Sequence, residues 1–155
     1  MIWIIIFGCV AVDILTKYIV VSSMELEASV NVIPGLFDLI YIRNYGAAFS
    51  SMQNKRLMLI ILTALMMAGL LVYLLAKGKE MLTAERVALA MIIGGGIGNL
   101  IDRIRLGYVV DFIKTSILPF IDFPVYNFAD ICVTLGCVLL MIAVIFEDKI
   151  RERRK

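Results

Sequence analysis

The sequence predicts an all-α membrane protein, a bundle of four transmembrane helices with a small extracytoplasmic β element and a short interfacial helix. Two observations lead to this fold class. Of the 155 residues, 62% are hydrophobic and 18% are charged, and the mean hydropathy is +0.97, which is far from the composition of a soluble domain. The apolar residues also gather into four runs, each close to the length that crosses the hydrocarbon core of a bilayer.

The four runs predict transmembrane helices at about residues 1–21, 57–76, 87–103 and 128–146. The run 57–76 carries no charge, and at ~1.5 Å per residue it spans about 30 Å of hydrocarbon. The uncharged stretches of the third and fourth runs, 87–101 and 131–146, are shorter, and each is bordered by an aspartate, Asp102 or Asp130. Spans this short need a wet or protein-lined end.

The segments between the runs predict the remaining elements. In residues 22–56, Pro34 and Gly35 precede a β-prone run from Leu39 to Ile42, which predicts the β element. In residues 104–127, the stretch 112–118 predicts the short interfacial helix. No linker or internal repeat divides the chain, so we expect a single membrane domain over residues 1–155.

The distribution of lysine and arginine predicts the orientation. Eight basic residues lie in the short loop 77–86 and the tail 147–155, whereas the longer segments 22–56 and 104–127 carry fewer for their length. Basic residues concentrate on the cytoplasmic side of membrane proteins. We therefore expect both termini to be cytoplasmic, with 22–56 and 104–127 on the outer side.

The composition excludes several classes of function. The sequence has no histidine, which removes histidine-dependent nucleophilic triads and the usual zinc or iron ligand sets. A net charge of +2 without a basic stripe argues against a nucleic-acid partner. The three cysteines lie in apolar runs, which is typical of buried, inert thiols. We expect no cofactor and no bound metal.

Polar residues gather at one depth of the predicted bundle, near its outer end. Helices 1–21 and 87–103 run outward and helix 128–146 runs inward, so their polar positions meet there, together with two positions of the outer segments. Ionisable groups at membrane depth cost at least ~2.5 kcal/mol near the bilayer centre, so a cluster of them indicates a functional cavity. The cluster comprises Asp13, Lys17, Asn44, Asn99, Asp102, Arg103, Asp111, Asn127 and Asp130. A structural alternative remains for some members, since Asp13 and Lys17 have the spacing of an ion pair on one helix face.

Asp111 and Asp130 are the strongest catalytic candidates, because each interrupts apolar neighbours without an adjacent cation. Two desolvated carboxylates held close together do not both ionise readily, so one keeps a proton. Such a pair can activate water and protonate a carbonyl oxygen. The residues alone leave two alternatives open: a proton-coupled transporter, and a Mg²⁺-dependent lipid-modifying enzyme that uses Asp102, Asp111 and Asp130 as oxygen ligands.

Five sequence blocks, in order along most of the chain, resemble the lipoprotein signal peptidases, or signal peptidase II, of bacteria. Each block is weak alone, but the combination with four spans is highly specific. The blocks are DILTKY (13–18), NYGAAFS (44–50), GGIGNLIDR (95–103), VVDF (109–112) and YNFAD (126–130).

The resemblance implies an intramembrane aspartyl endopeptidase that cuts the signal peptide of a diacylglyceryl-modified prolipoprotein just before the lipidated cysteine. It implies Asp111 and Asp130 as the catalytic dyad. Substrate binding or support of the dyad is implied for Asp13, Lys17, Asn44, Gly46, Asn99, Asp102, Arg103 and Asn127. It further implies a location in the bacterial cytoplasmic membrane with the site at the outer face, contact with membrane lipid, and inhibition by globomycin. We expect a monomer.

Overall fold

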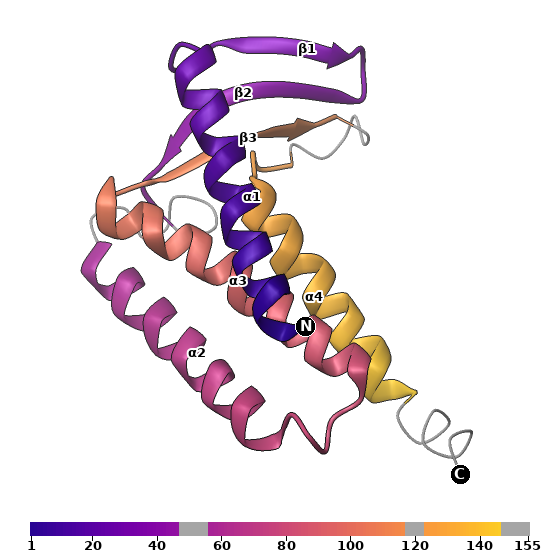
Figure 1. The fold of residues 1–155 in the computed structure, drawn as a ribbon. Helices are drawn as coiled ribbons and strands as arrows, with labels where there is room; N and C mark the ends of the chain where they lie inside the picture. Colours follow the sequence, from indigo (N-terminus) through magenta and orange to yellow (C-terminus); the bar gives the residue numbers. More distant parts are fainter. Residues whose placement is uncertain (47–55, 117–122, 147–155) are drawn as a thin grey trace.

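The computed structural model describes residues 1–46, 56–116 and 123–146, and it contains four long helices and a three-stranded sheet (Figure 1). The helices are α1 (Ile2–Ser23), α2 (Arg56–Lys77), α3 (Thr83–Arg105) and α4 (Phe128–Ile145). All four are long and apolar enough to cross a membrane, so the predicted four-helix bundle is confirmed. The main difference in bounds is at α3, which runs past the predicted 87–103 at both ends.

Helix α3 continues past the predicted ends because charged side chains satisfy its terminal backbone groups. The Glu85 carboxylate accepts a hydrogen bond of 2.5 Å from the backbone N–H of Leu82 at the N-terminus. At the other end, the Arg56 guanidinium donates to the carbonyl oxygens of Arg103 and Ile104 over 3.0 and 2.9 Å. A charge therefore marks the end of the apolar run without marking the end of the helix.

Helix α3 lies at the centre of the bundle. In the most apolar 18-residue stretch of α3, 61% is buried, against 17–22% in the corresponding stretches of the other three helices. Neighbouring atoms fill the space where a side chain would begin at Gly94, Gly95, Gly96 and Gly98. Those atoms belong to Cys9 of α1, Ala129 of α4, Met67 of α2 and the Asp13 carboxylate, respectively. The glycines of α3 thus serve the close approach of neighbouring helices.

The sheet lies at one end of the bundle, which we call the sheet end (Figure 1). Its strands are β1 (Ser29–Ile33), β2 (Phe37–Asn44) and β3 (Val109–Thr115), all antiparallel in the order β1-β2-β3. Helices α1 and α3 end here, and α2 and α4 begin here. A buried cluster fixes the sheet to α1, with Val20 of the helix packed against Tyr41, Val110 and Phe112.

The β element predicted within 22–56 is confirmed as the β1–β2 hairpin, but the interfacial helix predicted over 112–118 is wrong where the structure describes it. Residues 112–115 belong to β3, and residues 117 and 118 lie outside the described part. The backbone of β3 pairs with β2 on one side and with Tyr126 on the other. Hydrogen bonds to two partners outweigh the local helical pattern of this short segment.

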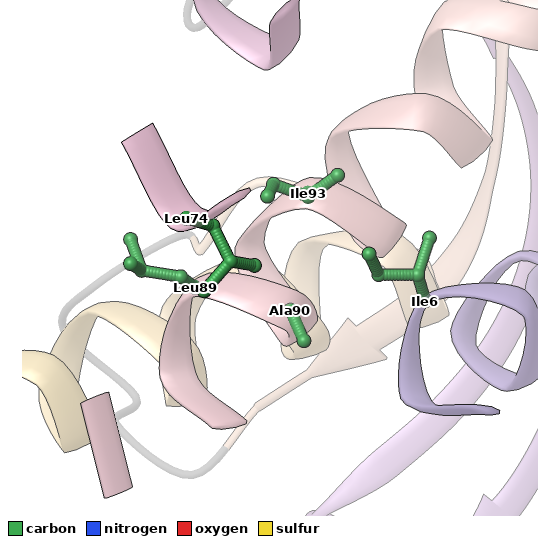
Figure 2. Close-up of a cluster of buried hydrophobic side chains, with 5 residues drawn as sticks. All are labelled: Ile6, Leu74, Leu89, Ala90 and Ile93. Carbon is green, nitrogen blue, oxygen red and sulfur yellow. The ribbon is translucent and has the colours of Figure 1, made fainter. Parts of the chain in front are cut away.

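The opposite end of the bundle, which we call the apolar end, is held by a hydrophobic cluster (Figure 2). Ile6 of α1 and Leu74 of α2 pack against Leu89, Ala90 and Ile93 of α3. None of these side chains is more than 3% exposed. The helices are therefore tied together by apolar packing at one end, and the polar residues are left to the sheet end.

Candidate active site

The two predicted dyad residues lie on different elements that meet at the sheet end. Asp111 is on β3, and Asp130 is in the first turn of α4. The Tyr126 backbone N–H donates to the Ile113 carbonyl oxygen over 3.0 Å, and the Tyr126 carbonyl oxygen accepts from the Ile113 N–H over 2.8 Å. This pairing lays the chain just before α4 along β3, and it brings together two carboxylates that are far apart in the sequence.

Asn127 joins the two carboxylates. It is the N-cap of α4, and its Oδ1 accepts a 3.0 Å hydrogen bond from the Asp130 backbone N–H. Its backbone N–H donates to Asp130 Oδ2 over 3.1 Å, and its Nδ2 donates to Asp111 Oδ1 over 2.7 Å. Asn127 is completely buried, so a single residue fixes one oxygen of each carboxylate.

The other oxygen of each carboxylate accepts from a second asparagine. Asn44 at the end of β2 donates from Nδ2 to Asp111 Oδ2 over 2.8 Å, and Asn99 of α3 donates from Nδ2 to Asp130 Oδ1 over 2.8 Å. The Gly46 backbone N–H donates to Asn44 Oδ1 over 3.0 Å and so orients that amide. The carboxylates are thus held by neutral donors that add no competing charge.

A buried charge network lies behind the dyad. Lys17 Nζ is 2.8 Å from Asp13 Oδ2 and 2.9 Å from Asp102 Oδ2, and it donates to Asn99 Oδ1 over 2.9 Å. Asp13 is fully buried and Lys17 is 4% exposed. The ion pair that the spacing of Asp13 and Lys17 allowed as an alternative is present, and the structure adds Asp102 and Asn99 to it.

Arg103 completes the set of predicted site residues. Its Nη1 donates to the Asn99 carbonyl oxygen over 3.3 Å, and its guanidinium lies in the electrostatic field of Asp102, Asp111 and Asp130. Hydrogen bonds or ion pairs now connect all ten predicted residues into one network. The sequence therefore predicted their common location, although the bonds between them come from the fold.

Burial raises the pKa of Asp111 from 3.8 to about 6, because the carboxyl is 2% exposed and loses solvation of its charged form. The hydrogen bond from Asn44 opposes this shift, and the nearby charge of Asp130 adds to it. Asp111 therefore holds a proton more readily than a solvated aspartate does.

A groove of about 320 Å³ opens beside Asp130 and along the outside of α4. Its lining is mostly apolar and aromatic, and among the described residues that line it Asp130 alone is charged. The lining residues are Phe123, Tyr126, Asp130, Ile131, Thr134 and Leu135. An extended apolar molecule can thus approach this carboxylate from the side of the bundle.

The geometry does not favour the arrangement of Asp102, Asp111 and Asp130 as one set of metal ligands. Asp102 Oδ2 is already engaged by Lys17 and by the Val110 backbone N–H, which donates over 3.1 Å. In the part of the chain that the structure describes, no three carboxylates or thiols are placed to hold a metal ion.

Sequence reasoning missed two backbone groups that belong to the site. The N–H of Val110 donates to Asp102, and the N–H of Ala129 donates to Asp13 Oδ1 over 3.0 Å. Each donor belongs to the residue just before an aspartate of the predicted dyad. Every residue but proline carries a backbone N–H, so no residue type in the sequence could have indicated this role.

Comparison with known proteins gives concordant results. A family model described as signal peptidase (SPase) II matches residues 5–146. Proteins named lipoprotein signal peptidase are 41% identical over 144 residues in Streptococcus thermophilus and 42% identical over 147 residues in Haemophilus influenzae. Those alignments cover 93% of this chain in both cases, and 91% and 85% of the two relatives.

Two solved structures, both described as bacterial membrane enzymes, have the same fold. One has a TM-score of 0.87 at 32% identity and covers 95% of this chain and 88% of its own. The other has a TM-score of 0.82 at 33% identity, with 92% and 91% covered. The family match over most of the chain and the four apolar helices lead to one conclusion. This chain belongs to the signal peptidase II family and is an integral membrane peptidase.

Proposed function

We propose that this protein is an intramembrane aspartyl endopeptidase that removes the signal peptides of diacylglyceryl-modified prolipoproteins by cleaving before the lipidated cysteine. The observation that carries this proposal is the junction at Asn127, which binds one oxygen of Asp111 and one of Asp130. The names of the similar proteins support the lipoprotein substrate.

The environments of the two carboxyls favour different roles. Asp111 is buried and its pKa is raised to about 6, which keeps the protonated form dominant up to about pH 6 and suits the role of acid. Asp130 borders the groove, where a substrate and a water molecule can reach it. We assign Asp130 as the base that activates the water.

In the proposed reaction, water attacks the scissile carbonyl carbon while Asp130 takes a proton from the water. Asp111 gives its proton to the carbonyl oxygen, and a neutral gem-diol forms. Asp111 then takes back a hydroxyl proton, Asp130 gives its proton to the amide nitrogen, and the C–N bond breaks. The products are a peptide carboxyl and the free amine of the lipidated cysteine, and the dyad regains its starting protonation.

The arrangement of the chain supports a site at the outer face of the cytoplasmic membrane. Both the start of α1 and the end of α4 lie away from the sheet end (Figure 1), and the basic loop 77–86 joins α2 to α3 at that same side. We therefore propose that both termini are cytoplasmic and that the sheet and the dyad face outward.

The test is cleavage of a purified lipidated precursor by the full-length protein in detergent, followed as a mobility shift on a gel. Asp111→Asn and Asp130→Asn should each lower the rate at least ~100-fold, the range for loss of a general acid or base. Asp38→Asn is the matched control: this carboxylate lies toward the start of β2 and accepts from Asn31. Near-normal cleavage by either dyad variant would reject the proposal.

The same assay separates the alternatives. Cleavage should persist in EDTA, whereas a Mg²⁺-dependent enzyme would lose activity. Globomycin should inhibit the wild-type enzyme. A transporter would instead show flux in liposomes and no cleavage product.

A further inference from the structure

Lys17 occupies a position from which it reaches both halves of the dyad. Its Nζ forms ion pairs with Asp13 Oδ2 and Asp102 Oδ2 over 2.8 and 2.9 Å, and it donates to Asn99 Oδ1 over 2.9 Å. The side chain is 4% exposed, so it does not touch a substrate in the groove. Asn99 bonds Asp130 directly, whereas Asp13 and Asp102 each bond the backbone of the residue that precedes a member of the dyad.

Two of these connections are alike. Asp13 accepts from the backbone N–H of Ala129, the residue before Asp130, over 3.0 Å. Asp102 accepts from the backbone N–H of Val110, the residue before Asp111, over 3.1 Å. The Lys17 ammonium thus pairs with two carboxylates. Each carboxylate accepts a hydrogen bond from the backbone immediately before one member of the dyad.

The third connection orients an amide. Asn99 Oδ1 accepts from Lys17 Nζ over 2.9 Å and from Asn127 Nδ2 over 3.0 Å, so its Nδ2 is turned toward Asp130 Oδ1. The reverse orientation would set the amide oxygen against the Asp130 carboxylate and the amide N–H group against the ammonium, and both contacts are repulsive. Asn44, which donates to Asp111, is oriented without a charge, by the backbone N–H of Gly46.

We propose that Lys17 is a positioning residue of the peptidase, which sets the separation of Asp111 and Asp130 through Asp102 and Asp13 and orients Asn99 toward Asp130. This inference rests on the proposed aspartyl mechanism. It assigns Lys17 an effect on the rate of the chemical step and none on substrate binding.

The alternative is that the ion pair only packs α1 against α3. Lys17→Met alone does not distinguish the two, because it leaves two buried carboxylates without a cation and can prevent folding. Asp13→Asn/Lys17→Met removes one charge of each sign and keeps an oxygen to accept from the Ala129 N–H. A purely structural role predicts that this variant is as active as the wild type once folded.

The proposal predicts that folded Asp13→Asn/Lys17→Met cleaves a lipidated precursor with KM within about twofold of the wild type and kcat about 100-fold lower, as expected for misplaced catalytic groups. The alkaline limb of the kcat profile should also move to higher pH. The charged groups that act on Asp111 are Asp130 and Lys17, with Arg103 nearby. Loss of the Lys17 cation removes an influence that lowers the pKa of Asp111.

Lys17→Arg serves as the second variant. It keeps the positive charge, but a planar guanidinium replaces the compact ammonium that contacts three partners. It should keep the wild-type pH profile while kcat falls at least ~10-fold at unchanged KM. Lys77→Met is the matched control, since it removes a cation from the exposed pair with Glu80 at the apolar end, and it should behave as the wild type.

Wild-type kcat and pH profile in folded Asp13→Asn/Lys17→Met would overturn the proposal. If that variant does not fold, wild-type kcat in Lys17→Arg would overturn it. Asp111→Asn in the same assay separates this failure from failure of the aspartyl mechanism: an active Asp111→Asn rejects the mechanism, whereas an inactive one leaves only the role of Lys17 in question.

Discussion

The two ends of the bundle are held by different interactions. At the apolar end, Ile6, Leu74 and Ile93 make only apolar contacts. Each contact adds a small stabilisation through burial of apolar surface and through dispersion. At the sheet end, Asp13 and Lys17 are buried as charges within a network of directed bonds. Burying such a pair brings about as much desolvation cost as attraction, so it adds little net stability.

Because of this difference, substitutions at the two ends should affect different properties: the stability of the fold at one end and the placement of the site residues at the other. Loss of apolar packing removes stabilisation in proportion to the atoms lost, and the remaining side chains adjust. Loss of one partner in the polar network leaves another polar group buried without a bond and displaces the groups attached to it. We infer that the apolar end mainly stabilises the fold and that the sheet end mainly places the dyad.

The largest effect on activity outside the dyad is expected for Asn127→Ala. The change removes the bond to Asp111 and the N-cap of the helix that carries Asp130. We expect cleavage to fall ~1,000-fold, within the range seen when catalytic groups lose their placement, with a loss of about 1 kcal/mol from the cap.

The measurement is kcat on a lipidated precursor together with thermal melting in detergent. Asn31→Ala, which removes an exposed partner of Asp38, is the control and should leave kcat unchanged. A rate for Asn127→Ala within tenfold of the wild type would contradict the role given to the sheet end.

A smaller effect on activity, but a clear one on stability, is expected for Leu74→Ala. This side chain is 1% exposed at the apolar end, and its loss leaves a cavity that costs roughly 2–5 kcal/mol. The melting temperature should fall while kcat, measured well below it, stays within twofold. Leu75→Ala provides the matched control, because the neighbouring Leu75 is 58% exposed. If kcat falls as steeply as stability, the two ends are not separable.

The sequence was sufficient to predict the helices and to predict that these polar residues lie together. The length of an apolar run is set by the thickness of the bilayer, so residues 57–76 predicted α2 to within one residue at each end. Ionisable and polar groups at membrane depth are energetically costly, so their positions in the sequence indicated the cluster that includes Asp13 and Asp130.

The sequence was not sufficient where structure depends on a distant partner. Residues 112–115 form a strand because β2 and Tyr126 supply hydrogen bonds, and a local pattern contains neither partner. The α3 glycines could equally have faced a substrate, and only the positions of Ala129 and Met67 decide for helix packing. The roles of the Val110 and Ala129 amides likewise depend on three-dimensional arrangement alone.

The central claim is that Asp111 and Asp130 form one unit with a proton on Asp111 below about pH 6. Infrared difference spectroscopy of the full-length protein, titrated from pH 4 to 8, measures the protonated carboxyl directly. Because the pKa of Asp111 is raised to about 6, its acid band should persist at pH 5 and disappear as the pH rises through about 6. The account predicts that this titrating band is absent from Asp111→Asn and shifts in Asp130→Asn. A band that is unchanged in Asp111→Asn would contradict it.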